Sequence, residues 1–294
     1  MSETTFTHGT WLSADGLSLS YRDYPGNTDR PPILCIPGLT RNARDFEPVA
    51  DNFAGEWRVI CPDLRGRGLS DYAKDPGSYM PETYVDDIEA LLQQLGLEKV
   101  VVIGTSLGGI VTMMLAARNP EPLAGVVLND IGPVIEASGL ERISEYVGQG
   151  RTFPTWMHAA RGLKEISGAA HPDFELSDWL TLTKRLMCLS GNGRITFDYD
   201  MKIAETFATP PDSPQIDLWQ AYRALSGRPV LALRGELSDL LSETTLARMA
   251  REIPGAEIVT VPRVGHTPTL AEPAAQEAIA RLLARTLQSA PATS

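Results

Sequence analysis

Short apolar runs alternate with amphipathic stretches along most of the chain. The runs are apolar nearly throughout rather than at every second position, which is typical of strands buried on both faces of a parallel sheet. The strands predicted in this way cover residues 32–36, 57–61, 99–103, 125–128, 229–233 and 257–261.

The amphipathic stretches between these runs predict helices. Residues 81–95 carry apolar side chains at helical spacing, with a proline in the first turn and Gly96 directly after the last turn. Residues 107–118, 242–252 and 273–287 repeat the pattern, so each of these helices has one apolar face to pack against a sheet.

The order of these elements predicts the fold class. Residues 9–13 and 17–21 flank Ala14-Asp15-Gly16, a turn sequence that predicts a hairpin. Strands alternating with helices after such a hairpin predict an α/β fold, a doubly wound sheet with the hairpin at one edge.

One segment breaks the alternation. Residues 131–225 contain no predicted strand and several helical pieces, including 177–189. We interpret 131–225 as a helical cap on a core formed by residues 1–130 and 226–294. Its large apolar residues would line a substrate pocket or pack the cap onto the core, and packing is preferred for each one taken singly. They are Trp156, Met157, Trp179, Leu182, Leu186 and Met187.

Charge and cysteine content exclude several kinds of partner. The net charge of −11 argues against nucleic acid and anionic membranes, because both require a basic face. Cys35, Cys61 and Cys188 are an odd number without short spacing, so neither a disulfide framework nor a metal site is expected. No apolar window is long enough to span a membrane and the first residues lack a secretion signal, so a cytoplasmic location is expected.

The candidate chemistry begins at Ser106, between two glycines in Gly-Thr-Ser-Leu-Gly at 104–108. A predicted strand precedes this pentapeptide and an amphipathic helix follows it. A sharp strand-to-helix turn holds such a serine in a strained conformation with its hydroxyl exposed, and the flanking glycines prevent collisions within the turn. Ser106 is therefore the candidate nucleophile.

A serine hydroxyl needs a base at neutral pH, and His266 is the candidate. It follows the last predicted strand, so the carboxyl ends of parallel strands would bring it to the same sheet edge as Ser106. Three carboxylates leave the sheet at this edge and compete to orient the histidine. The chain order serine, acid, histidine favours Asp239, with Asp130 second and Glu236 last.

An oxyanion hole needs two N–H donors. The backbone of Leu107, directly after the serine, is one candidate. The second is Leu39 in the loop after the first apolar strand, since Pro37 has no N–H and Gly38 makes the turn. Arg41 and Arg44 follow this loop and would meet an acidic substrate, although solvated arginines are the simpler interpretation.

These motifs resemble those of α/β-hydrolase-fold enzymes of the esterase and lactonase type. The resemblance covers about residues 9–130 and 228–288, and two features depart from the common pattern: Pro37-Gly38 stands where many relatives have His-Gly, and Asp239 lies four residues past Gly235 where three is common. The second departure keeps Asp130 open as the acid. The segments that carry the resemblance are Pro37-Gly38-Leu39-Thr40, Asp63-Leu64-Arg65-Gly66-Arg67-Gly68-Leu69-Ser70, Gly104-Thr105-Ser106-Leu107-Gly108, Ser238-Asp239 and Gly265-His266.

The resemblance implies an eight-stranded, mostly parallel sheet with helices on both faces, a serine–histidine–aspartate triad and no cofactor or metal. The expected activity is hydrolysis of a small-molecule carboxylic ester or lactone by Ser106, His266 and Asp239. Epoxide hydrolases and haloalkane dehalogenases of this fold have an aspartate where this chain has Ser106, which argues against their reactions. Enol-lactone, carbon–carbon bond, perhydrolase and cofactor-free dioxygenase chemistry remain alternatives, as does a ligand receptor without catalysis.

Overall fold

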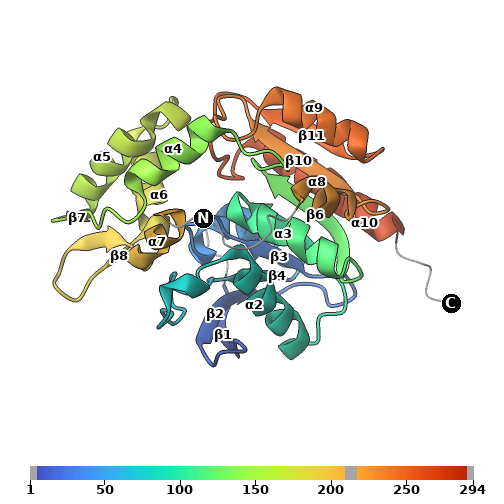
Figure 1. The fold of residues 1–294 in the computed structure, drawn as a ribbon, viewed down its shortest axis with the longest axis horizontal. Helices are drawn as coiled ribbons and strands as arrows, with labels where there is room; N and C mark the ends of the chain where they lie inside the picture. The colour runs from blue at the N-terminus through green and yellow to red at the C-terminus, as the bar shows by residue number, and fades with distance from the viewer. Residues whose placement is uncertain (1–4, 209–216, 290–294) are drawn as a thin grey trace.

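An eight-stranded sheet forms the centre of the computed structural model, which describes residues 5–208 and 217–289 (Figure 1). The strands from β4 to β11 pair in parallel, whereas β1 pairs with β2 and β2 with β4 in antiparallel fashion. The predicted mostly parallel sheet with an N-terminal hairpin at one edge is therefore confirmed. In spatial order the strands are β1 (Thr7–Leu12), β2 (Ser18–Tyr24), β4 (Val59–Pro62), β3 (Ile33–Ile36), β5 (Val100–Thr105), β6 (Leu123–Asn129), β10 (Val230–Gly235) and β11 (Glu257–Val261).

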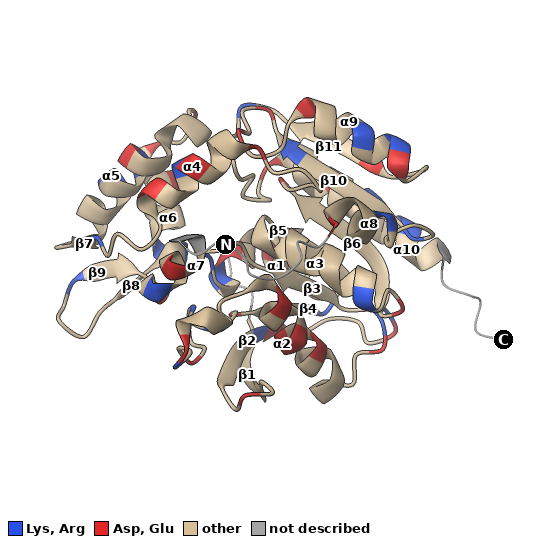
Figure 2. Cartoon of the chain, in the orientation of Figure 1, with Lys and Arg blue, Asp and Glu red and all other residues tan. Residues whose placement is uncertain are grey.

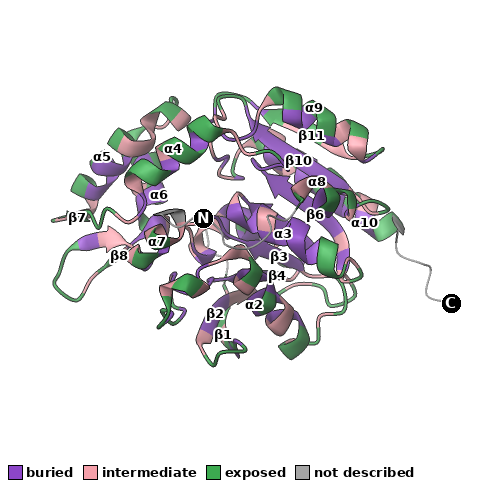
Figure 3. Cartoon of the chain, in the orientation of Figure 1, coloured by how far each residue is buried: buried purple, intermediate pink, exposed green. Residues whose placement is uncertain are grey.

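The central strands are buried on both faces, as their apolar runs predict. In β3, Leu34 and Ile36 join one hydrophobic core, whereas Ile33 and Cys35 join the core on the opposite face. β11 differs, because its residues alternate between half-buried and exposed positions as expected of an edge strand. Figure 3 shows the central strands as buried segments between partly exposed helices.

Helices cover both faces of the sheet, and each turns its apolar stripe inward. The four helices predicted at 81–95, 107–118, 242–252 and 273–287 are confirmed to within two residues at each end. Charged residues lie mainly on outer surfaces such as those of α2 and α9, while the strands carry few (Figure 2). One core contains residues of α2 (Pro81–Gln94), α3 (Leu107–Arg118), α8 (Leu218–Arg223) and α9 (Glu243–Glu252); the other contains residues of α1 (Glu47–Phe53) and α10 (Pro273–Ser289).

The segment between β6 and β10 contains a small antiparallel sheet that the sequence pattern does not predict. The predicted helix over 177–189 ends at Leu186, and Met187–Leu189 instead form a strand. The described elements are α4 (Ala137–Tyr146), β7 (Thr152–Phe153), α5 (Trp156–Ser167), α6 (Leu176–Leu186), β8 (Met187–Leu189), β9 (Ile195–Phe197) and α7 (Glu205–Ala208), with short 3₁₀ turns at Gly168–Ala170 and Met201–Ala204.

This segment has a hydrophobic core of its own, so most of its large apolar residues pack within the segment rather than onto the main body as predicted, and Met157 is exposed. Trp179, Leu182, Leu186 and Met187 are buried in it, and Trp156 packs against it. At the end of the segment, however, α8 packs on the main body through a fully buried tyrosine. The division into a core and a cap at 131–225 stays a prediction, and so does the cytoplasmic location. None of the helices in the described residues is both long and apolar enough to cross a membrane.

Candidate active site

Ser106 lies at the turn between β5 and α3, in a conformation that few non-glycine residues adopt. Its φ is 52° and its ψ is −116°, a geometry that costs about 1–3 kcal/mol and persists only where the surroundings enforce it. The flanking glycines enforce it by close approach. A Cβ on Gly104 would lie 2.5 Å from the Gly108 carbonyl oxygen, and a Cβ on Gly108 would lie 2.0 Å from the Ile36 carbonyl oxygen. The predicted strained serine turn is confirmed.

His266 lies in the loop between β11 and α10, and its imidazole meets the serine. Ser106 Oγ is 3.0 Å from His266 Nε2. The side chain of Asn129, at the end of β6, fixes this loop by donating to Thr267 Oγ1 at 3.1 Å and to the Pro268 carbonyl at 3.0 Å. The sequence analysis does not identify Asn129, because an asparagine at the end of an apolar strand belongs to no motif.

Asp130, not Asp239, is the carboxylate that contacts the histidine. Asp130 Oδ2 accepts a hydrogen bond from His266 Nδ1 at 2.7 Å, and the side chain of Asp130 is fully buried. The loop after β10 supports it: the backbone N–H of Gly235 donates to Oδ1 at 2.8 Å and the hydroxyl of Ser238 donates to Oδ2 at 2.8 Å. These three hydrogen bonds, one to Oδ1 and two to Oδ2, hold the carboxylate in one orientation.

The preference for Asp239 is therefore wrong as a matter of geometry. Its carboxylate forms a bidentate ion pair with Arg142 of α4, with bonds of 2.5 and 2.8 Å. This pairing lowers the pKa of Asp239, and the nearby His266 contributes a smaller lowering. Glu236 points elsewhere too, because its carboxylate accepts the backbone N–H of Arg263 at 2.6 Å. β6 lies between β5 and β10 in the sheet. Asp130, directly after β6, therefore lies nearer to Ser106 and His266 than its position in the sequence suggests.

The two predicted oxyanion donors flank the nucleophile. A Cβ on Gly38 would lie 3.6 Å from Ser106 Cβ, so the loop holding Leu39 runs beside the serine. The buried Arg67 fixes this loop, because its Nε donates to the Leu39 carbonyl at 2.9 Å. Within the described residues, neither the N–H of Leu39 nor that of Leu107 donates to another group. Both are available to a bound ligand.

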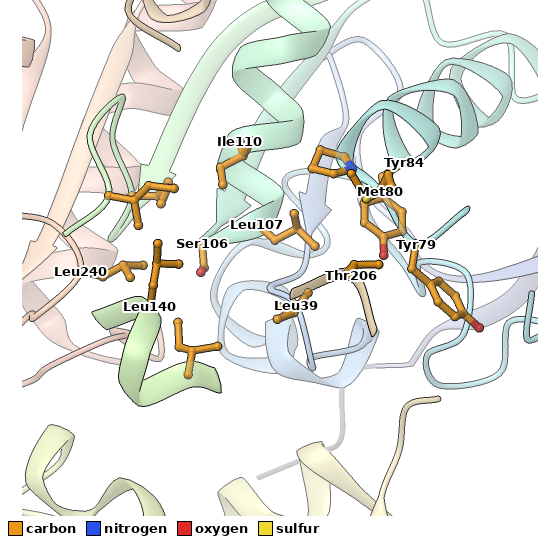
Figure 4. Close-up of a pocket in the computed structure, with 14 residues that line it drawn as sticks. Leu39, Tyr79, Met80, Tyr84, Ser106, Leu107, Ile110, Leu140, Thr206 and Leu240 are labelled. Carbon is orange, nitrogen blue, oxygen red and sulfur yellow. The ribbon is translucent and has the colours of Figure 1, made fainter. Parts of the chain in front are cut away.

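A mainly apolar cavity of about 220 Å³ opens at the serine (Figure 4). The hydroxyls of its two tyrosines are occupied: Tyr79 donates to Asp200 at 2.7 Å, and Tyr84 accepts from Arg67 at 2.8 Å. Their rings therefore present apolar surface. The wall residues from the segment after β6 lie before α5 or after β9, not on the α5 and α6 positions considered from sequence. The lining residues are Leu39, Tyr79, Met80, Pro81, Tyr84, Ser106, Leu107, Ile110, Ile131, Ile135, Leu140, Ile143, Thr206 and Leu240.

The arrangement suits nucleophilic chemistry. Across residues 5–208 and 217–289, no three His, Cys, Asp or Glu side chains come close enough together to hold a metal ion. What the residues bring together is a strained hydroxyl, an imidazole, a buried carboxylate and two free N–H groups beside an apolar cavity. That set can attack a carbonyl and stabilise the oxyanion that results.

Known proteins share this fold and much of this sequence. A family model described as the alpha/beta hydrolase fold matches residues 31–273. A 3-hydroxybutyrate-oligomer hydrolase from Cupriavidus necator is 36% identical over 271 residues, which cover 90% of this chain and 92% of that protein. A 2-(acetamidomethylene)succinate hydrolase from Mesorhizobium japonicum is 28% identical over 236 residues, covering 80% of this chain and 81% of that protein. The crystal structure of an alpha/beta hydrolase from Novosphingobium aromaticivorans has 58% sequence identity and a TM-score of 0.92, covering 97% of this chain and 99% of that one.

Proposed function

The chain belongs to the α/β-hydrolase-fold family, and we propose that it cleaves carboxylic esters or lactones through an acyl-enzyme on Ser106. The observation that carries the proposal is the unbroken series of contacts from serine to histidine to buried aspartate, at 3.0 and 2.7 Å. The similarity to a 3-hydroxybutyrate-oligomer hydrolase supports it, since hydroxy acids are joined to one another through ester bonds.

In the first half-reaction, Ser106 Oγ attacks the carbonyl carbon while His266 Nε2 takes its proton. Asp130 holds the other ring nitrogen and stabilises the imidazolium that forms. The N–H groups of Leu39 and Leu107 bind the oxyanion of the tetrahedral intermediate. The intermediate then collapses: the carbon–oxygen bond to the alcohol breaks, and His266 returns its proton to the departing oxygen.

In the second half-reaction, water replaces the alcohol. His266 takes a proton from the water, whose oxygen attacks the ester that links the acyl group to Ser106. The second tetrahedral intermediate collapses as its bond to Ser106 Oγ breaks; His266 returns the proton to Oγ, and the free carboxylic acid leaves. For a lactone, the alcohol and the acid belong to one molecule, and the product is a hydroxy acid.

The apolar cavity supports a hydrocarbon acyl group in this mechanism. Ser106, Leu39 and Leu107 lie at its wall, and aliphatic side chains make up most of the remainder (Figure 4). The cavity of about 220 Å³ is small for a ligand site, which favours short to medium acyl chains over long ones.

The test is hydrolysis of p-nitrophenyl esters from acetate to decanoate by the native chain and by Ser106→Ala. We expect turnover that depends on chain length and disappears in Ser106→Ala. Ser226→Ala, which removes an exposed hydroxyl before β10, is the matched control and should keep full activity. Turnover that survives in Ser106→Ala would refute the mechanism. Absence of ester and lactone turnover, with cleavage of a diketone, would favour the carbon–carbon bond alternative.

A further inference from the structure

The two arginines after the oxyanion loop have separate roles. Arg44 is committed to structure, because it donates to Asp198 at 2.5 Å and to the Arg185 carbonyl at 3.0 Å, tying α6 and the residue after β9 to the main body. Arg41 makes a single side-chain bond within the described residues, to Asp45 at 3.3 Å. This bond uses one donor and leaves most of the guanidinium donors of Arg41 without a partner among the described residues.

Arg41 lies beside the nucleophile. The point at which a Gly38 Cβ would stand is 3.4 Å from Arg41 Cγ and 3.6 Å from Ser106 Cβ, so the two side chains flank the same turn. Arg41 is not part of the apolar cavity wall. Its side chain is 18% exposed, so it remains accessible to a ligand while being largely shielded from water.

His171 and Tyr146, both from the segment between β6 and β10, lie near Arg41. His171 is buried, and its pKa falls to about 4 chiefly because of burial and further because of the charges of Arg41 and His266. Burial raises the pKa of Tyr146, and the positive charge of Arg41 opposes this rise. The Ala170 carbonyl, next to His171, accepts the N–H of Gly265 at 2.6 Å. The charge of Arg41 thus acts on His171 and Tyr146, and the charge of His266 acts on His171 as well.

A nitrogen of nearby His171 also lacks a hydrogen-bond partner. The Nδ1 atom of His171 is buried and makes no hydrogen bond within the part of the chain that the structure describes. A buried, unsatisfied nitrogen costs about 1–3 kcal/mol unless a ligand or water pairs with it. The polar subsite itself is marked by Arg41, which lies beside Ser106, outside the apolar cavity wall, with most of its donors unpaired in the described residues.

We propose that Arg41 binds a free carboxylate on the leaving alcohol, so that the preferred substrates are esters of hydroxycarboxylic acids. The inference rests on the proposed ester hydrolysis, in which the acyl group occupies the apolar cavity and the alcohol lies outside it. A guanidinium matches a carboxylate in charge and geometry. The chain as a whole repels anions, because its net charge is −11, so an anionic substrate needs a local cation such as this one.

The test compares three probes with one acyl group: butanoyloxyacetate, its neutral amide, and p-nitrophenyl butanoate. Acid release is followed in a pH-stat, and kcat/KM is measured for the native chain, Arg41→Gln and Arg41→Lys. We expect Arg41→Gln to lower the preference for the anionic over the neutral probe by about 10- to 100-fold, the value of a charge-assisted hydrogen bond. Arg41→Lys should lose less. Arg251→Gln, on the outer surface of α9, makes the same charge change and should leave the preference unaltered.

Direct binding gives an independent readout. Ser106→Ala should bind butanoyloxyacetate more tightly than the amide, and Ser106→Ala with Arg41→Gln should lose that difference. The inference would be overturned if Arg41→Gln lowered kcat/KM equally on all three probes, or if it left the preference for the anionic over the neutral probe unchanged. Failure of the proposed function has a different signature: the native chain would not hydrolyse p-nitrophenyl butanoate, or would do so without Ser106.

Discussion

Exchanging single carboxylates for amides distinguishes the two aspartates near the histidine. Asp130→Asn keeps the shape of a side chain that is fully buried and accepts bonds from Gly235, Ser238 and His266. Of these bonds, only the one to His266 gains strength when the imidazole becomes charged. Losing the carboxylate therefore acts on the transition state, and we expect kcat to fall by about 10⁴-fold, equivalent to about 5 kcal/mol.

Asp239→Asn makes the same chemical change at a different site. The side chains of Asp239 and Arg142 are 33% and 31% exposed, and ion pairs of this kind contribute at most about 1 kcal/mol after solvent screening. Its loss should slow turnover by less than about fivefold. The assay is hydrolysis of p-nitrophenyl butanoate, with circular dichroism spectra to establish that both variants are folded. A loss that is larger in Asp239→Asn than in Asp130→Asn would refute the assignment made from the contacts.

Three further predictions concern the turn, the buried histidine and the cavity. Gly108→Ala should lower the free energy of unfolding by about 3 kcal/mol or more in urea titrations, because its Cβ would collide with the Ile36 carbonyl; Gly191→Ala, with open space around its Cβ, is the control and should change little. The pKa of His171 is about 4 in the folded chain and 6.5 in the unfolded chain. As the pH drops from 6.5 to 4, the unfolded chain binds the proton before the folded chain does. The free energy of unfolding therefore falls over this range. Between pH 7 and pH 5 this costs about 2 kcal/mol, and an unchanged pH dependence in His171→Phe would contradict it. Leu140→Trp should shift the preferred p-nitrophenyl ester to a shorter chain by narrowing the cavity, whereas Leu189→Trp, on an exposed strand away from it, should not.

The sequence predicts the sheet, Ser106 and His266, but not Asp130 as the residue in contact with the histidine. The sheet and the serine turn are predicted because their patterns lie within short stretches of the sequence. The apolar runs of β3 and β5 need burial on both faces, and the glycines around Ser106 report the turn directly. The acid is not local. Three carboxylates leave the same sheet edge, and the outcome depends on the path of the loop after β10, which supports Asp130 through Ser238 and turns Asp239 toward α4.

The small sheet after α6 was missed for a different physical reason. Strands of two or three residues are too short to show a period, and Met187 continues the apolar spacing of the helix before it. The cavity wall was missed because it is assembled from separate segments. Leu140 and Thr206 reach it from distant parts of the chain, and neither position carries a pattern of its own.

The loop after β10 combines a fixed part with a part that is free to change. Gly235 and Ser238 support the buried carboxylate, but the neighbouring Asp239 only ties the loop to α4 through Arg142. Under the proposed mechanism, β5 and β6 supply both the nucleophile and the acid, and paired residues Thr105 and Asn129 keep their ends in register. Evolution or design can therefore remodel the contact between Asp239 and α4, and with it the cavity wall at Leu140 and Leu240, without rebuilding the reactive groups.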